Sequence, residues 1–398
     1  MRLTIVQYAG DYREAWERFD RGGKATYQAQ RYSVDFVGRL AERLEQVAVI
    51  CAVTDQPYDV VLPNKVRAIG GGLKQGFQSR EIFHLLAGTA PNRLVLTTPM
   101  VPLLKWARSH RIRTITAFAD SFRRRPRTWI THRRLASELN DANVEWVGNH
   151  QIAACLSLTD IGVRTEKIIP WDWPPSHRPD DHEPRELPEG RPLKLVYVGS
   201  VEQAKGVGDL LRALGQLKMD GECPEVTVIG HDRDGRMEAL AGLLGLSEQV
   251  KFAGVIPNED VPEAMRQADA VVIPSRHEYP EGLPLTIYEA LAARTPIIAS
   301  DHPMFRGTLV DEQSALVFPA TNSEALAGAI RRLHRDRDLY ARLSRNSAEA
   351  WHALQLPVTW GDLIEKWLSG DSDNRDWLCA HRLNSGLYDR QIEVRQDV

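Results

Sequence analysis

Short apolar runs alternate along this chain with stretches whose apolar positions recur at helical spacing. In the first half the pattern predicts buried strands at LTIVQY (3–8), QVAVICAVT (46–54), VRAIG (66–70), RLVLTT (93–98), RTITAF (113–118) and VEWVGN (144–149). Between several of them it predicts helices, over 24–44, 80–86 and 101–109. Strands that alternate with helices in this way are typical of a doubly wound α/β domain with a parallel sheet.

The second half repeats this alternation after a proline-rich interruption. Residues 174–192 hold six prolines and show no apolar periodicity, which predicts an exposed, semi-rigid linker. Strand patterns then resume at 194–198, 225–235 (a strand and turn), 250–257, 268–274, 295–300 and 315–321. We therefore predict a first domain over 1–180 and a second over 191–345, with largely helical sequence from 338 to 369.

Composition is that of a globular protein and excludes several classes of function. The 50 basic and 53 acidic residues leave a formal charge of −3, so the chain has no net positive charge that would attract nucleic acid. The four cysteines show no zinc-binding spacing. The chain enters a strand at once, without a charged and apolar leader, and has no apolar run long enough to span a bilayer. These features lead us to expect a cytoplasmic protein.

Residues 274–300, PSRHEYPEGLPLTIYEALAARTPIIAS, hold the densest candidate chemistry. Gly282 breaks the chain and Pro284 suits the first turn of a helix, where a missing N–H costs nothing. Glu281 then stands in the loop before the helix, and Glu289 lies one to two turns inside it. Free N–H groups at a helix start attract anions, and carboxylates accept sugar hydroxyls. The stretch predicts a nucleotide-sugar site.

This stretch, in the form PS-x-x-E…EGLPLTIYEALA…TPIIAS, resembles the signature of family 4 glycosyltransferases, which are retaining enzymes with the GT-B fold. Two glutamates separated by seven residues mark the donor site of that family, and Glu281 and Glu289 have this spacing. The resemblance implies two Rossmann-like domains that face each other across a cleft and close about the linker. It assigns the acceptor to the first domain, the donor to the second, and residues 346–370 to helices that cross back to the first. Residues 371–398 form a tail that we do not place.

The same resemblance assigns roles to individual residues. Lys205 would neutralise the donor diphosphate together with the N–H groups of residues 283 and 285, and Glu289 would hold the ribose hydroxyls. Glu281 would contact the donor sugar or support the phosphate-binding loop. The expected catalytic residues are Lys205, Glu281 and Asp120. The expected nucleotide-sugar site comprises Gly22, Gly23, Gly199, Ser200, Lys205, Gly230, Val255, Glu281, Gly282, Leu283, Pro284, Leu285 and Glu289.

The chain departs from the family pattern at two points. Where the family often has an arginine after the glycine turn, this chain has Ser200, and Arg276 could substitute for the lost guanidinium. Where many members have a histidine, this chain has Asp120, just past a strand end at which such sheets bind ligands. Asp120 could contact the transferred sugar or the acceptor, or it could simply cap a turn. Gly22-Gly23 could likewise be a plain turn.

Two further features remain open. Arg123, Arg124, Arg125 and Arg127 form a basic cluster, which is either a solvated face or a lip for an anionic acceptor or acidic lipid at a membrane surface. Asp232 and Asp234 form a D-x-D pair, which we interpret as a helix cap rather than a metal site. We expect no metal and no cofactor, since a lysine and a helix terminus can neutralise a diphosphate.

The sequence therefore predicts a retaining glycosyltransferase that moves a sugar from a UDP- or GDP-sugar to an acceptor hydroxyl in glycan, polysaccharide or glycolipid synthesis. The acceptor could be a sugar, a lipid-linked molecule or a small metabolite. Three alternatives stay open: a donor-binding protein that has lost catalysis, a nucleotide-sugar epimerase of the same fold, and a dinucleotide-dependent oxidoreductase. The oxidoreductase would need a G-x-G-x-x-G motif after the first strand of a domain, and no such motif follows the strands at 3–8 or 194–198.

Overall fold

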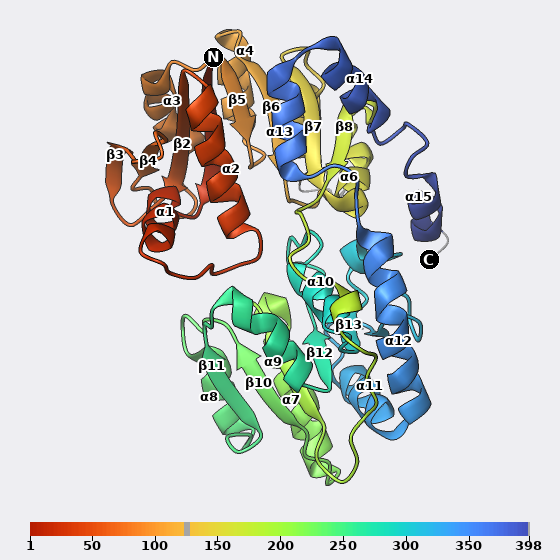
Figure 1. Cartoon of the computed structure of the whole chain (residues 1–398). Helices are drawn as coiled ribbons and strands as arrows, with labels where there is room; N and C mark the ends of the chain where they lie inside the picture. Colours follow the sequence, from red (N-terminus) through yellow and green to blue (C-terminus); the bar gives the residue numbers. More distant parts are fainter. Residues whose placement is uncertain (123–127, 397–398) are drawn as a thin grey trace. The chain divides into compact units, whose positions relative to one another are not determined.

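The computed structural model describes residues 1–122 and 128–396, and the chain divides into two compact units (Figure 1). Unit 1 comprises Met1–Ala25, Ala29–Pro174 and Leu356–Glu393. Unit 2 comprises Thr26–Gln28, Pro175–Gln355 and the residues from Val394 onward. Each unit is built on its own sheet, and no helix of the described residues is long and apolar enough to cross a membrane.

Unit 1 contains an eight-stranded sheet in the order β3-β4-β2-β1-β5-β6-β7-β8, in which only the β3–β4 pair is antiparallel. Its strands are β1 (Arg2–Ala9), β2 (Gln46–Val53), β3 (Pro57–Val61), β4 (Arg67–Gly71), β5 (Arg93–Leu96), β6 (Arg113–Phe118), β7 (Val144–His150) and β8 (Ile168–Trp171). Its helices are α1 (Tyr12–Asp20), α2 (Gln30–Arg43), α3 (Phe83–Thr89), α4 (Val101–Ser109), α5 (Trp129–Leu139), α6 (Gln151–Asp160), α13 (Trp360–Ser369) and α14 (Ser372–Ala380). The short α15 (Asp389–Gln396) ends the described chain.

Unit 2 contains a six-stranded, all-parallel sheet in the order β11-β10-β9-β12-β13-β14. Its strands are β9 (Lys194–Val198), β10 (Glu225–Ile229), β11 (Val250–Gly254), β12 (Ala270–Ile273), β13 (Ile297–Ser300) and β14 (Leu316–Phe318). Its helices are α7 (Val207–Met219), α8 (Arg236–Leu243), α9 (Val261–Gln267), α10 (Leu285–Ala292), α11 (Ser323–Arg335) and α12 (Arg337–Leu354). Two doubly wound domains of this kind are the GT-B architecture that the sequence predicts.

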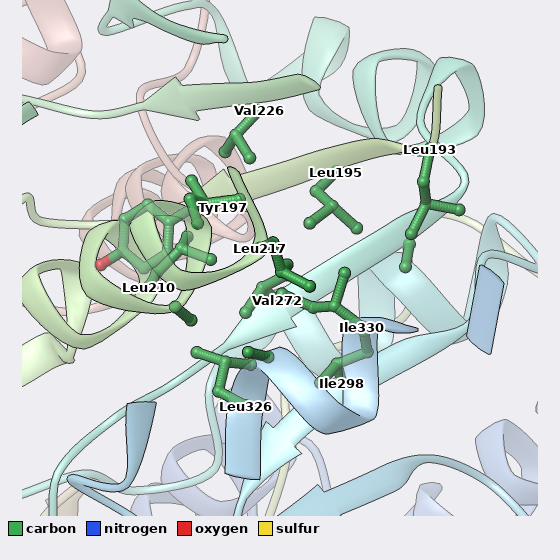
Figure 2. Packing of buried hydrophobic residues seen from close by; sticks show 14 of the residues in the cluster. Leu193, Leu195, Tyr197, Leu210, Leu217, Val226, Val272, Ile298, Leu326 and Ile330 are labelled. Atoms are coloured by element: carbon green, nitrogen blue, oxygen red, sulfur yellow. The ribbon is translucent and has the colours of Figure 1, made fainter. Parts of the chain in front are cut away.

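The sheet of unit 2 is covered by α7 and α11, which share one hydrophobic core with it. Figure 2 shows Leu210 and Leu217 of α7 beside Leu326 and Ile330 of α11, with side chains of β9, β10, β12 and β13 around them. These residues are almost fully buried, and burial of apolar surface on this scale is the main stabilising term of the domain. The core fixes the carboxyl ends of β9 and β12, from which the candidate site is built.

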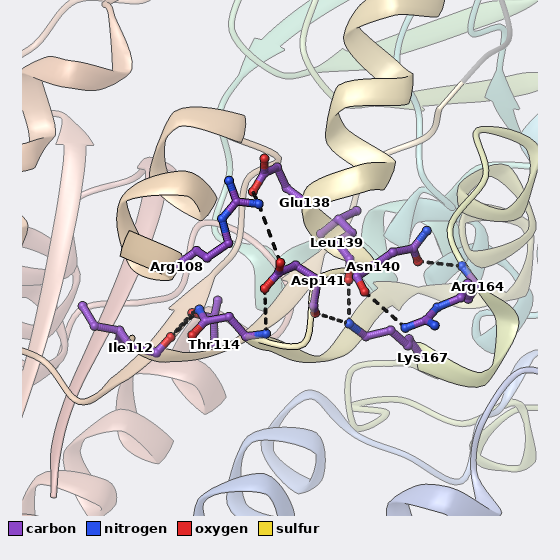
Figure 3. Close-up of polar contacts among 10 residues, drawn as sticks. Arg108, Ile112, Thr114, Glu138, Leu139, Asn140, Asp141, Arg164 and Lys167 are labelled. Atoms are coloured by element: carbon purple, nitrogen blue, oxygen red, sulfur yellow. Dashed lines mark hydrogen bonds and ion pairs between the residues drawn. The ribbon is translucent and has the colours of Figure 1, made fainter. Parts of the chain in front are cut away.

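A polar network ties helices to strands at the amino ends of β6 and β7 in unit 1 (Figure 3). Buried Lys167 donates from Nζ to the carbonyls of Leu139 and Asp141, at 2.8 and 2.6 Å, where α5 ends. Arg108 of α4 pairs with Glu138 of α5 at 3.0 Å. Burial lowers the pKa of Lys167 to about 8. The network lies at the edge of the sheet opposite to the carboxyl ends of the strands, where it links α4, α5 and the segment before β8.

The structure differs from the sequence prediction in three places. Between β1 and Gly22, where no helix was predicted, the structure has α1, and β3 was not predicted at all. The helix expected over 24–44 begins only at Gln30. Residues 174–192 are mostly exposed, as predicted, but they are anchored to unit 2, because Leu187 joins its core and Arg185 donates to the carbonyl of Ala268 at 2.6 Å and to Thr295 at 3.0 Å.

The C-terminal sequence belongs to unit 1 and is largely helical. Trp360, Leu363 and Trp367 of α13 lie in the same hydrophobic cluster as side chains of β1, β2 and β6. The tail left unplaced by the sequence contains α14 and α15, and its Leu378, Leu383 and Tyr388 are buried in the cores of unit 1.

Candidate functional site

The candidate donor site lies at the carboxyl ends of β9, β10 and β12 in unit 2. Gly199 follows β9 with φ +148°, and Gly230 follows β10 with φ +144°. A Cβ at Gly230 would stand 1.8 Å from the carbonyl oxygen of Gly199, so only glycine allows these two turns to touch. Ser200 is exposed beside them, and its carbonyl accepts a hydrogen bond of 2.6 Å from Tyr197.

The loop that carries Lys205 packs directly on the loop after β12. Gly206 adopts φ +79° as the N-cap of α7, and a Cβ there would lie 1.9 Å from the carbonyl oxygen of Pro274. The amide of Arg276 donates to the carbonyl of Ala204 at 2.9 Å. The backbone therefore holds Lys205 against the 274–284 loop, although Lys205 and Pro274 lie 69 positions apart in the sequence.

Lys205 and Glu281, the two unit 2 residues predicted as catalytic, form an ion pair. Nζ of Lys205 lies 2.5 Å from Oε1 of Glu281, and Ser275 donates to the same oxygen at 2.7 Å. The ammonium group also lies 4.3 Å from the ring centroid of Tyr279. Glu281 is buried, so its charge is stabilised by these partners rather than by water.

Helix α10 begins beside this ion pair with an open N-terminus. Its N-cap is Pro284, one position earlier than the first-turn place predicted for the proline, and no side chain caps the helix. Leu283 is buried and Leu285 is half-buried. The N–H groups of the first turn and the Lys205 ammonium give this part of unit 2 the donor chemistry that a phosphate requires.

Glu289 lies in the second turn of α10 and is 4% exposed. Its Oε1 accepts a hydrogen bond of 2.8 Å from the amide of Asn258, which follows β11. Burial raises the pKa of Glu289 to about 7, although the Asn258 amide opposes the shift. A buried carboxylate with a titration near neutrality is typical of functional sites. Val255, the other predicted residue of this region, is exposed in the same turn.

Arg276 does not take the place predicted for it as a phosphate ligand. Its guanidinium makes two hydrogen bonds of 2.7 Å to the buried carboxylate of Asp209 in α7. It therefore anchors the 274–284 loop to α7. Asp232 of the D-x-D pair accepts from the amides of Met237 and Glu238 at 2.9 and 3.0 Å and caps α8, as predicted. Among the described residues no group of three or more His, Cys, Asp or Glu side chains could hold a metal ion.

The remaining predicted site residues belong to unit 1. Gly22, with φ +77°, and Gly23 end α1, and their amides donate to the carbonyls of Phe19 and Arg18 at 3.0 and 2.8 Å. This is a Schellman motif, so both glycines have a structural role as a helix terminus.

Asp120 follows β6, is half-buried, and has a pKa raised to about 6 by burial. The basic cluster of Arg123, Arg124, Arg125 and Arg127 lies outside the described residues.

Three residues of the site were not predicted from the sequence. Ser275 stands inside the quoted signature and could have been chosen from it. Tyr279 stands in the same loop, but nothing in its sequence context indicates that its ring lies next to Lys205. Asn258 is separated from Glu289 by 31 positions, and the two meet because α9, which follows Asn258, packs on α10.

Comparisons with known proteins agree with this geometry. The profile of the family "Glycosyl transferases group 1" matches residues 178–350. The amylovoran biosynthesis glycosyltransferase AmsK of Erwinia amylovora is 29% identical over 147 residues, 36% of each chain. The phosphatidyl-myo-inositol mannosyltransferase of Mycobacterium leprae is 33% identical over 157 residues, which are 39% of this chain and 41% of that one. The chain thus matches less than half the length of these curated relatives.

Solved structures match over nearly the whole chain. Sucrose-phosphate synthase from Thermosynechococcus elongatus has a TM-score of 0.67 at 17% identity and covers 93% of this chain and 99% of its own. Anabaena HepE in complex with UDP-glucose has a TM-score of 0.66 at 15% identity, with 93% and 99% covered. At such identities the likeness establishes the fold of both units.

Proposed function

We propose that this chain, which has the GT-B fold and carries a glycosyl transferases group 1 domain over residues 178–350, is a retaining glycosyltransferase that uses a nucleotide-sugar donor. The observation that carries the proposal is the placement of the Lys205–Glu281 ion pair beside the uncapped start of α10. Glu289 on the same helix adds a carboxylate for ribose hydroxyls. The cation and the helix terminus match the charge of a diphosphate, and the carboxylates match the hydroxyls of the sugars attached on either side of it.

In this proposal the ammonium of Lys205 and the N–H groups of Leu283 and Leu285 stabilise charge that develops on the leaving diphosphate. Electrostatic stabilisation of this kind is usually the largest contribution to catalysis. Pro284 has no N–H, so this helix start offers one donor fewer than another residue would give. Glu281 orients Lys205 through their ion pair and contacts the donor sugar with its remaining oxygen.

The acceptor hydroxyl attacks the anomeric carbon from the face that the diphosphate leaves, and the leaving phosphate takes its proton. This front-face course is what the family resemblance implies for a retaining enzyme, and it needs no protein nucleophile. Asp120, at the carboxyl end of β6, would bind the acceptor. The donor would be a UDP- or GDP-sugar, and HepE, which shares the fold, binds UDP-glucose. We propose that no metal takes part.

A titration screen with UDP, GDP, ADP and their common sugars, with and without EDTA, tests this proposal. We expect one diphosphate to raise the melting temperature and to bind equally well in EDTA. The matching nucleotide sugar should then release free nucleotide when acceptor is added. A protein that binds none of the nucleotides would refute the transferase function, and affinity that disappears in EDTA would refute metal independence.

A donor-binding protein without transferase activity is the second candidate. It is favoured by Arg276, whose guanidinium is committed to Asp209 and so leaves the site without the arginine that family members often have after the glycine turn. Donor binding without nucleotide release, against a panel of acceptors, would identify it. An epimerase would instead convert the donor sugar with no acceptor present.

We also propose that the protein works in the cytoplasm and contacts acidic membrane lipid through its basic cluster. The described part of the chain next to this cluster offers exposed Trp129 and Ile130 at the start of α5, with the guanidinium of Arg133 5.1 Å from the Trp129 ring centroid. Tryptophan and arginine together are typical of a membrane interface. Co-sedimentation with phosphatidylglycerol vesicles but not with phosphatidylcholine vesicles is the expected result, and equal binding to both would contradict it.

A further inference from the structure

Two aromatic rings stack at the carboxyl edge of the unit 1 sheet. Tyr8 stands near the end of β1, and Phe77 stands in the loop after β4. Their ring centroids are 5.3 Å apart and their planes differ by 24°. Both side chains are half-buried, so part of the pair is open to solvent. The pair therefore presents flat apolar surface at the edge where parallel sheets bind ligands.

The loop that carries Phe77 is fixed over the strand ends by hydrogen bonds. The amide of Leu73 donates to the carbonyl of Ala52 in β2 at 3.2 Å, and the amide of Gly76 donates to the hydroxyl of Tyr8 at 2.9 Å. Gly76 has φ +82°, which favours glycine at this turn. The two rings are thus held together by backbone contacts as well as by stacking.

Strand register places polar groups next to the ring pair. Val6 of β1 pairs with Leu96 of β5, and Leu96 pairs with Thr116 of β6. Thr98 and Asp120 follow the carboxyl ends of β5 and β6, which come next to β1 in the sheet. The edge thus combines aromatic surface, a hydroxyl and a carboxylate at the ends of three adjacent strands.

This combination matches one class of acceptor. A pyranose ring has an apolar face of C–H groups, which packs on aromatic side chains, and a rim of hydroxyls, which bond to hydroxyl and carboxylate oxygens. An acceptor that presents a phosphate to this edge would be repelled by the Asp120 carboxylate. Building on the proposed function, we propose that Tyr8 and Phe77 form the platform of the acceptor site and that the acceptor presents a neutral pyranose ring to it.

Saturation-transfer NMR on the full chain tests the proposal with methyl glycosides of glucose, galactose, mannose and N-acetylglucosamine. We expect at least one glycoside to bind, with the strongest saturation on the C–H protons of one ring face. Phe77→Leu keeps apolar volume but removes the flat ring, and should weaken binding tenfold or more. Tyr8→Leu removes the other ring of the pair and should weaken binding by a similar factor. Trp129→Ala, which removes an exposed aromatic ring on α5, is the matched control and should bind as wild type.

Equal affinity in Phe77→Leu and wild type would overturn the proposal, as would the absence of binding by every glycoside. Thermal unfolding of each variant shows whether a loss of binding reflects a loss of fold, and Tyr8→Leu and Phe77→Leu together keep the test valid if one of them is unstable. UDP and GDP titrations of the same samples separate the two hypotheses. Nucleotide binding without glycoside binding would refute only the platform, and glycoside binding without nucleotide binding would refute only the transferase.

Discussion

Glu289 shows how one buried side chain can make donor binding depend on pH. Its pKa is raised to about 7 because burial penalises the carboxylate. Ribose hydroxyls must donate to an ionised carboxylate, so the protonated form has to lose its proton before the donor binds. We predict that donor affinity rises about tenfold between pH 6 and pH 8, following the ionised fraction. Titration calorimetry in buffers of different ionisation enthalpy should show proton release on binding.

The control for this prediction is Glu289→Gln, which cannot ionise and should bind donor weakly with a flat pH profile. Stability gives a second check. The pKa of Glu289 in the folded protein lies above the ordinary value of 4.5, so protonation of this side chain favours the folded state. This stabilisation is fully present below pH 4.5 and is lost as the pH rises through 7. The variant should therefore gain stability relative to wild type across that window. A wild-type donor affinity that is constant from pH 6 to 8 would contradict the assignment.

Lys205 and Glu281 offer a prediction in which catalysis and stability separate. Lys205→Ala removes charge-assisted bonds to the diphosphate, about 1.5–3 kcal/mol, and should lower kcat about 10- to 150-fold. It also leaves the buried Glu281 carboxylate without its cation, which should lower the free energy of unfolding. Steady-state kinetics and urea unfolding measure the two effects.

The double variant Lys205→Ala/Glu281→Gln separates the two roles of the pair. It removes the unpaired charge, so it should recover stability while turnover stays low. If turnover recovered as well, Lys205 would act only through the fold.

At the scale of the element, the site depends on glycine turns that let strand ends touch. Gly230→Ala would bring a Cβ to 1.8 Å from the carbonyl oxygen of Gly199, at a φ of +144° that alanine rarely adopts. We predict a loss of at least about 2 kcal/mol in the free energy of unfolding, with weaker donor binding because the turn at Gly199 must move. Gly242→Ala in α8, where a Cβ meets open space, should be neutral or stabilising by up to about 1 kcal/mol. Urea unfolding of both variants checks the contrast.

Elements with strong local signals could be predicted from the sequence, and elements set by distant partners could not. The buried parallel strands form continuous apolar runs, so β1, β2, β6 and β9 were predicted within one or two residues. Helix α1 was missed although Asp11 caps it by accepting from the amide of Glu14 at 3.0 Å, because its sequence is mostly charged. Strand β3 was missed because it is an exposed edge strand, paired within the described chain with β4 alone, so its sequence shows no buried apolar run. Lys205 and Glu281 were each chosen from the family resemblance, whereas their ion pair and the contacts of Asn258 and Tyr279 required the fold.

At the scale of the whole molecule, the chain leaves unit 1 at Pro174 and returns to it at Leu356. The stability of unit 1 therefore depends on sequence that follows all of the unit 2 sheet. The return was expected only from the family resemblance, because local patterns in α13 and α14 do not tell which core the helices join. Leu363 of α13 shows the dependence clearly, since it is fully buried among side chains of unit 1 and fills the space that Gly148 of β7 leaves open.

We predict that Leu363→Ala destabilises unit 1 by about 2–5 kcal/mol, the usual cost of a cavity in a core. Amide hydrogen exchange should accelerate in peptides from β1, β2, β6 and β7, which lie about 200 residues or more away in sequence. Peptides from β9 to β13 should be unaffected, and so should nucleotide affinity, because the donor site is built within unit 2. Leu217→Ala, in the core of unit 2, is the reciprocal control and should accelerate exchange in β9 and β12 and weaken nucleotide binding. Equal acceleration in both sheets after either substitution would mean that the two cores unfold as one cooperative body.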